Sequence, residues 1–299
     1  MSHGALHGPV LVTGAAGMLG SQLLLTAPEG IEPIGTDLAE SPAGNPEVAR
    51  PGVDLSDTAS VEALLNELGR VSAILHPAAF TAVDRAESEE ALARRVNAYA
   101  AENVALACAA RGIPMVLVST DFVFDGRKRS PYRPDDPTSP LGVYGRTKLE
   151  GEELARAAHP DGLCVVRTQW LYGPRGTHFP GTMLRLAAER DELRVVSDQV
   201  GSPTSTLEFA PALWDLLRLG ARGTYHAACE GRASWYDLAA LTLQLAGKDT
   251  KVSPCTTAEF PRPAPRPAFS VLDCSRTTEL RGRALAPWRV ALSDYLSNP

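Results

Sequence analysis

The stretch Pro9-Val10-Leu11-Val12-Thr13-Gly14-Ala15-Ala16-Gly17-Met18-Leu19-Gly20 decides the fold of this 299-residue chain. Its first five residues predict a buried strand, and an amphipathic helix is expected from Met18 onward. Between them, Gly14 permits a tight turn, Gly17 lets a pyrophosphate approach the backbone, and Gly20 lets the helix pack closely on the strand. Free N–H groups at the start of such a helix attract phosphate. We therefore predict a dinucleotide site formed by Gly14, Gly17, Met18, Leu19 and Gly20.

An acidic residue follows the second predicted strand, residues 31–35. Asp37 has the position of the carboxylate that binds the 2′-hydroxyl of an NAD adenosine ribose and repels the 2′-phosphate of NADP. No arginine follows within the next several residues, so NADH is slightly preferred and NADPH stays open. A turn aspartate is the alternative interpretation of Asp37. Asp54 and Leu55, after the next loop, are expected near the cofactor's adenine.

Strands and helices alternate along the first half of the chain. Strands are predicted over 73–76, 114–118 and 163–167, and helices over 60–68, 87–111 and 144–158. Apolar strands separated by helices are typical of a parallel sheet covered on both faces, so we predict an α/β, Rossmann-type doubly wound sheet. After about residue 170 the elements shorten and Pro and Gly become frequent. Residues 1–170 should form the dinucleotide-binding domain and 171–299 mainly a smaller substrate-binding lobe, with some later segments returning to the first domain.

Composition argues against several function classes. The net charge is −6 with both signs mixed along the chain, which disfavours nucleic-acid binding. No apolar run reaches the ~20 residues that cross a membrane, and the N-terminus lacks a signal pattern. The five cysteines are scattered and form no metal-ligand spacing with the six histidines. We therefore expect reduced thiols, a cytoplasmic location and no metal.

Tyr144 and Lys148 are the strongest catalytic candidates. In Tyr144-Gly145-Arg146-Thr147-Lys148 a helix would place the phenol and the ammonium on one face, one turn apart. A tyrosine titrates near ~10, and a neighbouring cation is expected to lower that pKa so that the phenol exchanges protons more readily. The lysine could also reach the nicotinamide ribose. A surface pair is the common explanation of this spacing, but the context favours catalysis.

A polar strand end precedes the tyrosine helix. The strand over 114–118 continues into Ser119 and Thr120, which places two hydroxyls at the ligand-binding edge of a parallel sheet. A hydroxyl there can donate a hydrogen bond to a substrate carbonyl and hold it beside Tyr144. Together with the glycine loop, these residues predict an NAD(P)-dependent oxidoreductase.

Six segments carry a resemblance that covers almost the whole chain. They are VTGAAG (12–17), AAFTAVD (78–84), STDFVFDG (119–126), SPLGVYG (139–145), RTQWLYG (167–173) and DQVGSPT (198–204). On these segments the chain resembles the extended short-chain dehydrogenase/reductases and, within them, the dTDP-4-dehydrorhamnose reductase family. The glycine loop and the Y-x-x-x-K spacing mark only the superfamily, whereas the T-A-V-D, tryptophan and D-Q-x-G-x-P-T segments are more specific.

The resemblance implies reduction, by NADH or NADPH, of the C4 ketone of a dTDP-4-keto-6-deoxy sugar, with dTDP-4-dehydro-L-rhamnose giving dTDP-L-rhamnose as the first choice. Thr120, Tyr144 and Lys148 would form the catalytic set. Tyr144 would protonate the developing alkoxide, Thr120 would orient the carbonyl, and Lys148 would tune the tyrosine and hold the cofactor. Ala78 and Ala79 would pass close to the cofactor.

The resemblance also assigns a sugar pocket. Its residues would be Thr81, Val83, Thr120, Phe122, Tyr144 and Trp170. Core packing is the alternative for Trp170, and packing at a helix start is the alternative for Thr81 and Val83. Arg266 would contact the nucleotide or remain exposed to solvent.

Two positions depart from the family pattern. Many relatives have a tyrosine where this chain has Phe122, so one hydroxyl near the substrate is missing and a different deoxysugar stays open. Some members dimerise through a metal held by glutamates, and the matching positions here are Gln22 and Leu207. We therefore expect no such metal and leave a homodimer open.

Other functions stay open at this point. A sugar-nucleotide epimerase would keep its NAD bound through turnover. A dehydratase is disfavoured because Asp121-Phe122 follows Thr120, where dehydratases carry an aspartate-glutamate pair. A non-catalytic regulatory subunit of the same fold usually lacks the catalytic residues, which are intact here. The expected partner is a nucleotide sugar, without nucleic acid or membrane.

Overall fold

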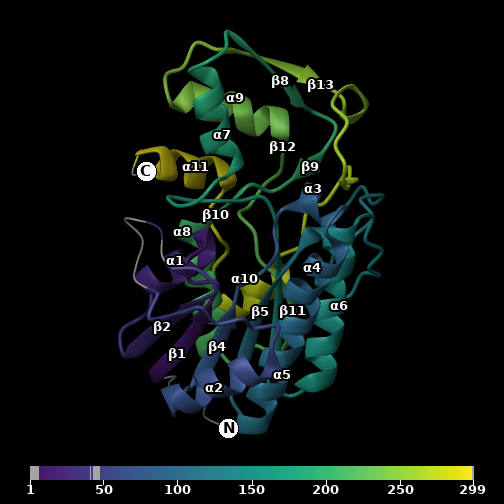
Figure 1. Ribbon diagram of the computed structural model, residues 1–299. Helices are drawn as coiled ribbons and strands as arrows, with labels where there is room; N and C mark the ends of the chain where they lie inside the picture. Colours follow the sequence, from purple (N-terminus) through teal and green to yellow (C-terminus); the bar gives the residue numbers. More distant parts are fainter. Residues whose placement is uncertain (1–6, 41, 43–47, 298–299) are drawn as a thin grey trace.

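A seven-stranded parallel sheet forms the centre of the protein, in the strand order β11-β6-β5-β4-β1-β2-β3 (Figure 1). The structure is a computed structural model and describes residues 7–40, 42 and 48–297. The strands are β1 (Gly8–Thr13), β2 (Ile31–Asp37), β3 (Arg50–Pro51), β4 (Ala73–His76), β5 (Met115–Thr120), β6 (Leu163–Thr168) and β11 (Gly223–His226). The order reverses between β1 and β4, and ligands of such sheets bind at the carboxyl ends of the strands at this point. The predicted Rossmann-type fold is confirmed.

Alternate residues of each strand build the hydrophobic core on the two faces of the sheet. In β1, Val10 and Val12 face the helices α1 (Met18–Leu25) and α8 (Thr206–Arg218), whereas Leu11 faces α2 (Thr58–Leu68), α5 (Ala100–Arg111) and α6 (Val143–Ala158). This alternation follows from the period of two in a strand. Because both faces are covered, the strands are apolar throughout.

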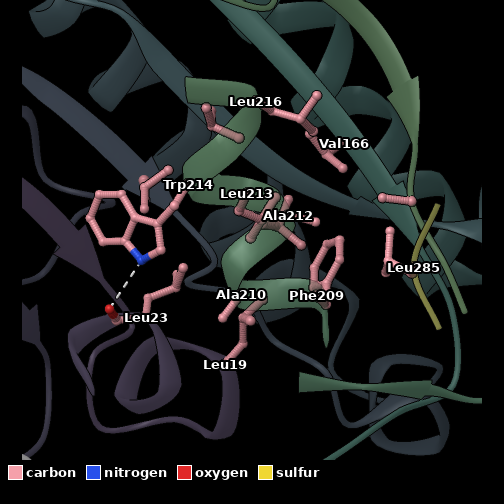
Figure 2. Close-up of a cluster of buried hydrophobic side chains, with 14 of the residues drawn as sticks. Leu19, Leu23, Val166, Phe209, Ala210, Ala212, Leu213, Trp214, Leu216 and Leu285 are labelled. Atoms are coloured by element: carbon pink, nitrogen blue, oxygen red, sulfur yellow. Dashed lines mark hydrogen bonds between the residues drawn. The ribbon is translucent and has the colours of Figure 1, made fainter. Parts of the chain in front are cut away.

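The largest fully buried side chain of the first face is Trp214 of α8. It is buried, and its indole N–H donates a hydrogen bond to the carbonyl of Leu23 in α1 at 3.2 Å (Figure 2). Leu19 of α1 and Phe209 of α8 belong to the same cluster. Full burial of each such apolar side chain is worth about 1.5–3 kcal/mol. These contacts fix the helix that follows the glycine loop.

The predicted helix over 87–111 differs from the structure. The chain forms α3 (Val83–Ala86), then α4 (Glu90–Arg94), a π-helical turn (Arg95–Tyr99) and α5 without interruption. The π turn presents Asn97, whose side chain accepts from the N–H of Phe80 at 2.8 Å and donates to Thr147 at 3.0 Å. A π turn contains one more residue than an α-helical turn, and the bridging hydrogen bonds of the buried Asn97 amide favour it. The periodicity of apolar residues does not reveal such a turn.

A smaller lobe lies beyond the carboxyl edge of the sheet (Figure 1). It contains α7 (Phe179–Ala187), β8 (Glu192–Val196), α9 (Trp235–Leu245), β13 (Lys251–Cys255) and α11 (Trp288–Ser297). Met183, Leu193 and Leu243 are part of its core. By contrast, β11, α8 and α10 (Ser275–Arg281) return to the sheet. The remaining short elements are η2 (Asp121–Val123), β7 (Leu171–Tyr172), β9 (Val200–Gly201), β10 (Thr204–Ser205), β12 (Ala233–Ser234) and η3 (Thr257–Glu259).

No helix in the described part of the chain combines the length and the apolar character needed to cross a membrane.

Candidate active site

The glycine loop joins β1 to α1 at the reversal point of the sheet. Gly14 has a φ of +59°, and a Cβ there would lie 2.8 Å from the Cα of Ala78. A Cβ on Gly20 would lie 2.1 Å from the carbonyl oxygen of Gly14. The predicted tight turn at Gly14 and close packing at Gly20 are therefore confirmed. Gly17 is the N-cap of α1 and supplies no capping side chain, so this helix start can offer N–H groups to an anion.

Asp37 is tied to the glycine loop. It is the last residue of β2, and its carboxylate accepts hydrogen bonds from the N–H groups of Ala16 at 3.0 Å and Ala39 at 3.2 Å. The first bond places the carboxylate against the loop, as expected of a residue that shares a ligand with it. The second is the local bond of a turn aspartate, and contact of Asp37 with a cofactor ribose stays a prediction.

Asp54 and Leu55 lie in the loop before α2. Hydrogen bonds from the hydroxyl and N–H of Ser56 hold the Asp54 carboxylate and lower its pKa. Leu55 is buried in the core on the α5 face, and its carbonyl accepts a hydrogen bond from Asn103. Packing explains Leu55 by itself, and contact with the adenine stays a prediction for both residues.

The end of β4 is fixed against the glycine loop. His76 Nδ1 lies 2.8 Å from the hydroxyl oxygen of Thr13, which also accepts a weak hydrogen bond from the N–H of Ala78 at 3.4 Å. Burial, assisted by the charge of Lys148, lowers the pKa of His76 to about 3, so this imidazole is neutral at physiological pH. Ala78 is thus held beside Gly14, at the predicted cofactor edge, and contact of Ala79 with the cofactor stays a prediction.

Tyr144 and Lys148 occupy the first two turns of α6 and point toward the carboxyl end of β5. Lys148 Nζ donates to the carbonyl of Val118 at 2.8 Å, and the Tyr144 phenol lies beside the side chain of Thr120, which influences its pKa. The ring of Phe122 meets the Tyr144 ring edge-on, with centroids 5.4 Å apart. The structure therefore brings together the three predicted catalytic residues.

The pKa of Tyr144 differs from the prediction. Burial raises it to about 12, the charge of Asp121 acts in the same direction, and only the neighbouring Thr120 side chain opposes them. The predicted lowering by Lys148 is therefore wrong for this structure, because desolvation of the phenolate dominates. Burial also lowers the pKa of Lys148 to about 8, against the charge of Glu152. At neutral pH the phenol holds its proton, as a proton donor must.

A buried ion pair lies below Lys148, and sequence analysis missed it. Glu152 accepts two hydrogen bonds from the Arg167 guanidinium, at 2.9 and 2.6 Å, and one from the hydroxyl of Ser119 at 2.5 Å. The side chains of Glu152 and Arg167 are 0% and 5% exposed. The network joins α6, β5 and β6 and so fixes the helix that carries Tyr144 and Lys148. The i+4 spacing from Lys148 to Glu152 was the available signal.

An aromatic cavity of about 410 Å³ adjoins this edge. Phe122 and Trp170 line it, which joins two of the predicted sugar-site residues to one space. The Trp170 ring stacks on Trp235 with centroids 3.6 Å apart. Trp170 has a φ of +48°, unlike every other non-glycine residue in the described chain, and such strain is concentrated at functional sites. Thr81 is exposed at the start of α3, and no side-chain contact places Val83 in this cavity.

Asp84 of α3 is linked to the rim of the cavity. Its carboxylate accepts hydrogen bonds from Arg262 at 2.6 Å, from Arg266 at 2.8 Å and from the N–H of Ala264 at 3.2 Å. Burial opposes ionisation, but these bonds lower the pKa of Asp84 to about 2. Arg262 and Arg266 both line the cavity. Of the two predictions for Arg266, an exposed side chain is wrong.

Comparison with known proteins decides the family. The model of the RmlD substrate binding domain matches residues 8–299. A dTDP-4-dehydrorhamnose reductase of Streptomyces griseus is 41% identical over 290 residues, which cover 95% of this chain and 91% of the relative. The chain belongs to the dTDP-4-dehydrorhamnose reductase family. The predicted family and oxidoreductase class are confirmed.

Other members of the family and its neighbours differ in the sugar they are named for. A probable dTDP-4,6-dihydroxy-2-methyloxan-3-one 4-ketoreductase of Streptomyces antibioticus is 42% identical and covers 95% of this chain and 93% of its own length. A dTDP-4-keto-6-deoxy-D-glucose reductase of Streptomyces niveus is 38% identical and covers 95% of both chains.

Solved structures of the family have the same architecture. A dTDP-4-dehydrorhamnose reductase ortholog from Clostridium acetobutylicum superposes with a TM-score of 0.89 at 38% identity, covering 97% of this chain and 98% of its own. The Bacillus anthracis dTDP-4-dehydrorhamnose reductase in complex with NADP has a TM-score of 0.90 at 33% identity, covering 98% and 100%. A UDP-glucose 4-epimerase of Thermus thermophilus, at 23% identity, shares the fold alone.

Proposed function

We propose that this protein reduces the C4 ketone of a dTDP-4-keto-6-deoxy sugar with NADH or NADPH, converting dTDP-4-dehydro-L-rhamnose to dTDP-L-rhamnose. One observation carries the proposal: Thr120, Tyr144 and Lys148 meet at the carboxyl end of β5, and Phe122 connects them to the aromatic cavity. The family names of the relatives supply the sugar.

The residues of the glycine loop fit a nicotinamide dinucleotide. The backbone crosses at Gly14 and Gly20 so closely that a Cβ would fill the space, and the start of α1 lacks a capping side chain. Gly14, Gly17 and Gly20 would hold the pyrophosphate, Asp37 the adenosine ribose, and Lys148 the nicotinamide ribose. When bound, the nicotinamide supplies the hydride. The Asp37 carboxylate disfavours a 2′-phosphate, and so NADH is the preferred reductant in this proposal.

Tyr144 supplies the proton. Its raised pKa of about 12 keeps the phenol protonated until negative charge develops on the sugar oxygen, whose basicity then exceeds that of the phenolate. Lys148 is held by the carbonyl of Val118, and the charge of Glu152 favours its ammonium form, so it keeps a positive charge beneath the site at neutral pH. Thr120 orients the carbonyl from the strand end.

The cavity suits the nucleotide half of the substrate. Stacked rings of Trp170 and Trp235 offer a flat apolar surface, and Arg262 and Arg266 place cations at its rim. A thymine ring and a diphosphate carry the matching apolar face and negative charge. Phe122 provides no hydroxyl, which leaves Tyr144 and Thr120 as the donors to the sugar oxygen at this end.

Steady-state oxidation of NADH and NADPH by the purified protein tests the proposal. The substrates are dTDP-4-dehydro-L-rhamnose and dTDP-4-keto-6-deoxy-D-glucose, each with a product analysis at C4. Tyr144→Phe should lower the turnover number by about 100-fold to 10,000-fold because it removes the proton donor, while cofactor binding is retained.

Two outcomes would overturn the proposed function. A product epimerised without net oxidation of the cofactor would indicate an epimerase. Equal turnover in Tyr144→Phe would remove Tyr144 as the proton donor. A preference for NADPH of tenfold or more in kcat/KM would overturn only the role of Asp37, at about 1.4 kcal/mol per factor of ten.

A further inference from the structure

Asp121 is a buried carboxylic acid that the chemistry described above does not use. It begins η2 directly after Thr120 and is 1% exposed. Its Oδ1 accepts a hydrogen bond from the Thr120 hydroxyl at 3.0 Å, whereas Oδ2 has no hydrogen-bond partner within residues 7–40, 42 and 48–297. A buried carboxylate oxygen without a partner is costly, because desolvation is not compensated.

The bond to Asp121 determines what the Thr120 hydroxyl can do. A hydroxyl has one proton to donate and two lone pairs that accept. The Thr120 oxygen accepts from the N–H of Phe122 at 3.2 Å and gives its own proton to Asp121. A hydroxyl in this orientation cannot donate to a substrate carbonyl, which is the role proposed for Thr120.

We propose that Asp121 is a positioning residue whose protonation decides whether the Thr120 hydroxyl donates to the substrate carbonyl. This inference rests on the proposed reduction of a sugar ketone. An ionised Asp121 takes the Thr120 proton, as in the structure. A protonated Asp121 instead donates its own O–H to the Thr120 oxygen, and the Thr120 hydroxyl proton is then free for the C4 oxygen. No proton of Asp121 is consumed, since Tyr144 supplies the proton of the reaction.

The surroundings of Asp121 place its titration near neutral pH. Burial raises its pKa to about 6, although the neighbouring hydroxyl groups of Ser270 and Thr120 act in the opposite direction. The Ser270 hydroxyl donates to the Gln169 side chain at 3.3 Å, and neither of these side chains is charged. Tyr144 on α6 is the titratable group coupled to Asp121.

The cations of the neighbouring elements are engaged elsewhere. Lys148 on α6 donates to Val118 of β5, and Arg167 on β6 pairs with Glu152. On the segment that carries Ser270, Arg266 pairs with Asp84. Within the described residues, Asp121 therefore has no ion pair that would keep it ionised at low pH.

The charge of Asp121 also affects Tyr144, and this effect changes the reaction rate in the same direction as the reorientation of the Thr120 hydroxyl. The negative charge of Asp121 raises the pKa of Tyr144 and makes the phenol a weaker acid. Protonation of Asp121 removes this charge and frees the Thr120 proton at once. Both effects predict faster reduction when Asp121 is neutral.

The pH profile of kcat/KM tests the inference. In the wild type we expect kcat/KM to fall about tenfold or more as the pH rises through about 6, since one donor to the developing oxyanion is lost. In Asp121→Asn the side chain has the same shape but does not titrate, so the fall of kcat/KM near pH 6 (the limb near 6) should disappear. A second fall near the Lys148 pKa of about 8 should remain. A merely structural defect would lower the whole profile and leave both limbs in place.

A matched variant controls for the loss of a nearby aspartate. Asp125 follows in the same segment, and its carboxylate accepts from the N–H of Arg127 and the hydroxyl of Tyr132. Hydrogen bonds lower its pKa, so it stays ionised over this range. Asp125→Asn should keep the limb near 6. A limb that persists unchanged in Asp121→Asn, or that vanishes in Asp125→Asn, would overturn the inference without touching the proposed function.

A measurement without turnover separates the two proposals. The carboxyl carbon of Asp121, assigned in ¹³C-aspartate-labelled protein by comparison with Asp121→Asn, should titrate with a midpoint near 6. Thr120→Val removes a hydrogen bond that stabilises the carboxylate and should raise that midpoint. A midpoint near the ordinary aspartate value of ~3.9, or one indifferent to Thr120→Val, would overturn the inference even if no sugar is reduced.

Discussion

The Glu152–Arg167 pair offers the sharpest test of how the site is held together. Glu152→Gln keeps the shape of the side chain but removes its charge, leaving the buried guanidinium of Arg167 without a counter-ion. Breaking a buried pair by removing one partner costs about 3–5 kcal/mol. Because both side chains are almost fully buried, solvent cannot replace the lost partner, and we expect the free energy of unfolding to fall by about this amount.

The control lies two residues away on the same helix. Glu150 accepts hydrogen bonds from Arg94 at 2.6 and 2.9 Å, a geometry like that of the buried pair, but its side chain and that of Arg94 are 29% and 50% exposed. Water and salt screen such a pair, so Glu150→Gln should cost less than about 1 kcal/mol.

Urea unfolding of the wild type and both variants, followed by circular dichroism at neutral pH, gives the two free-energy changes. Equal losses for Glu150→Gln and Glu152→Gln would refute the reasoning, because burial would then not matter. A second readout concerns Lys148. The charge of Glu152 supports its ammonium, so Glu152→Gln should move the alkaline limb of kcat/KM below its expected position near pH 8.

Two further predictions concern the cofactor loop and the cavity rim. Gly14→Ala should lower the free energy of unfolding by about 1–2 kcal/mol, because residue 14 has a left-handed backbone. It should also weaken cofactor binding, because the new Cβ would collide with Ala78. Gly112→Ala introduces the same backbone strain with open space around it, so cofactor affinity in a fluorescence titration should be unchanged. Asp84→Asn releases Arg262 and Arg266 and should raise KM for the sugar nucleotide about tenfold, with less effect on kcat. The control is Asp215→Asn, which releases Arg281 and Arg283 away from the cavity and should leave KM unchanged. Equal behaviour within either pair would contradict the prediction.

Local pattern was sufficient for the framework of this protein. The strands over 73–76 and 163–167 were predictable within a residue. Short apolar runs that alternate with predicted helices are typical of buried strands in a parallel sheet. The glycine loop was equally clear, since turn, phosphate approach and helix packing each require a glycine at a fixed offset. The π turn at residues 95–99 was not predictable, because Asn97 adopts it to bridge Phe80 and Thr147.

The electrostatics of the site came from the tertiary structure. The i, i+4 spacing of Tyr144 and Lys148 predicted their common face, yet it gave the wrong direction for the Tyr144 pKa. Spacing along a helix reports which groups are neighbours, whereas the pKa depends on how much water the fold removes. Asp121, adjacent to Thr120 in sequence, showed its coupling only once its burial was known.

The sequence by itself determined the parallel sheet, the glycine loop and the common helix of Tyr144 and Lys148, because each depends on residues close together along the chain. Only the tertiary structure decided what surrounds them. Asp84 and Arg266 are 182 residues apart, and Glu152 reaches Arg167 across the helix–strand connection from α6 to β6. Such contacts depend on where the sheet places its crossovers, and this placement is settled by packing over the whole core rather than by any local pattern.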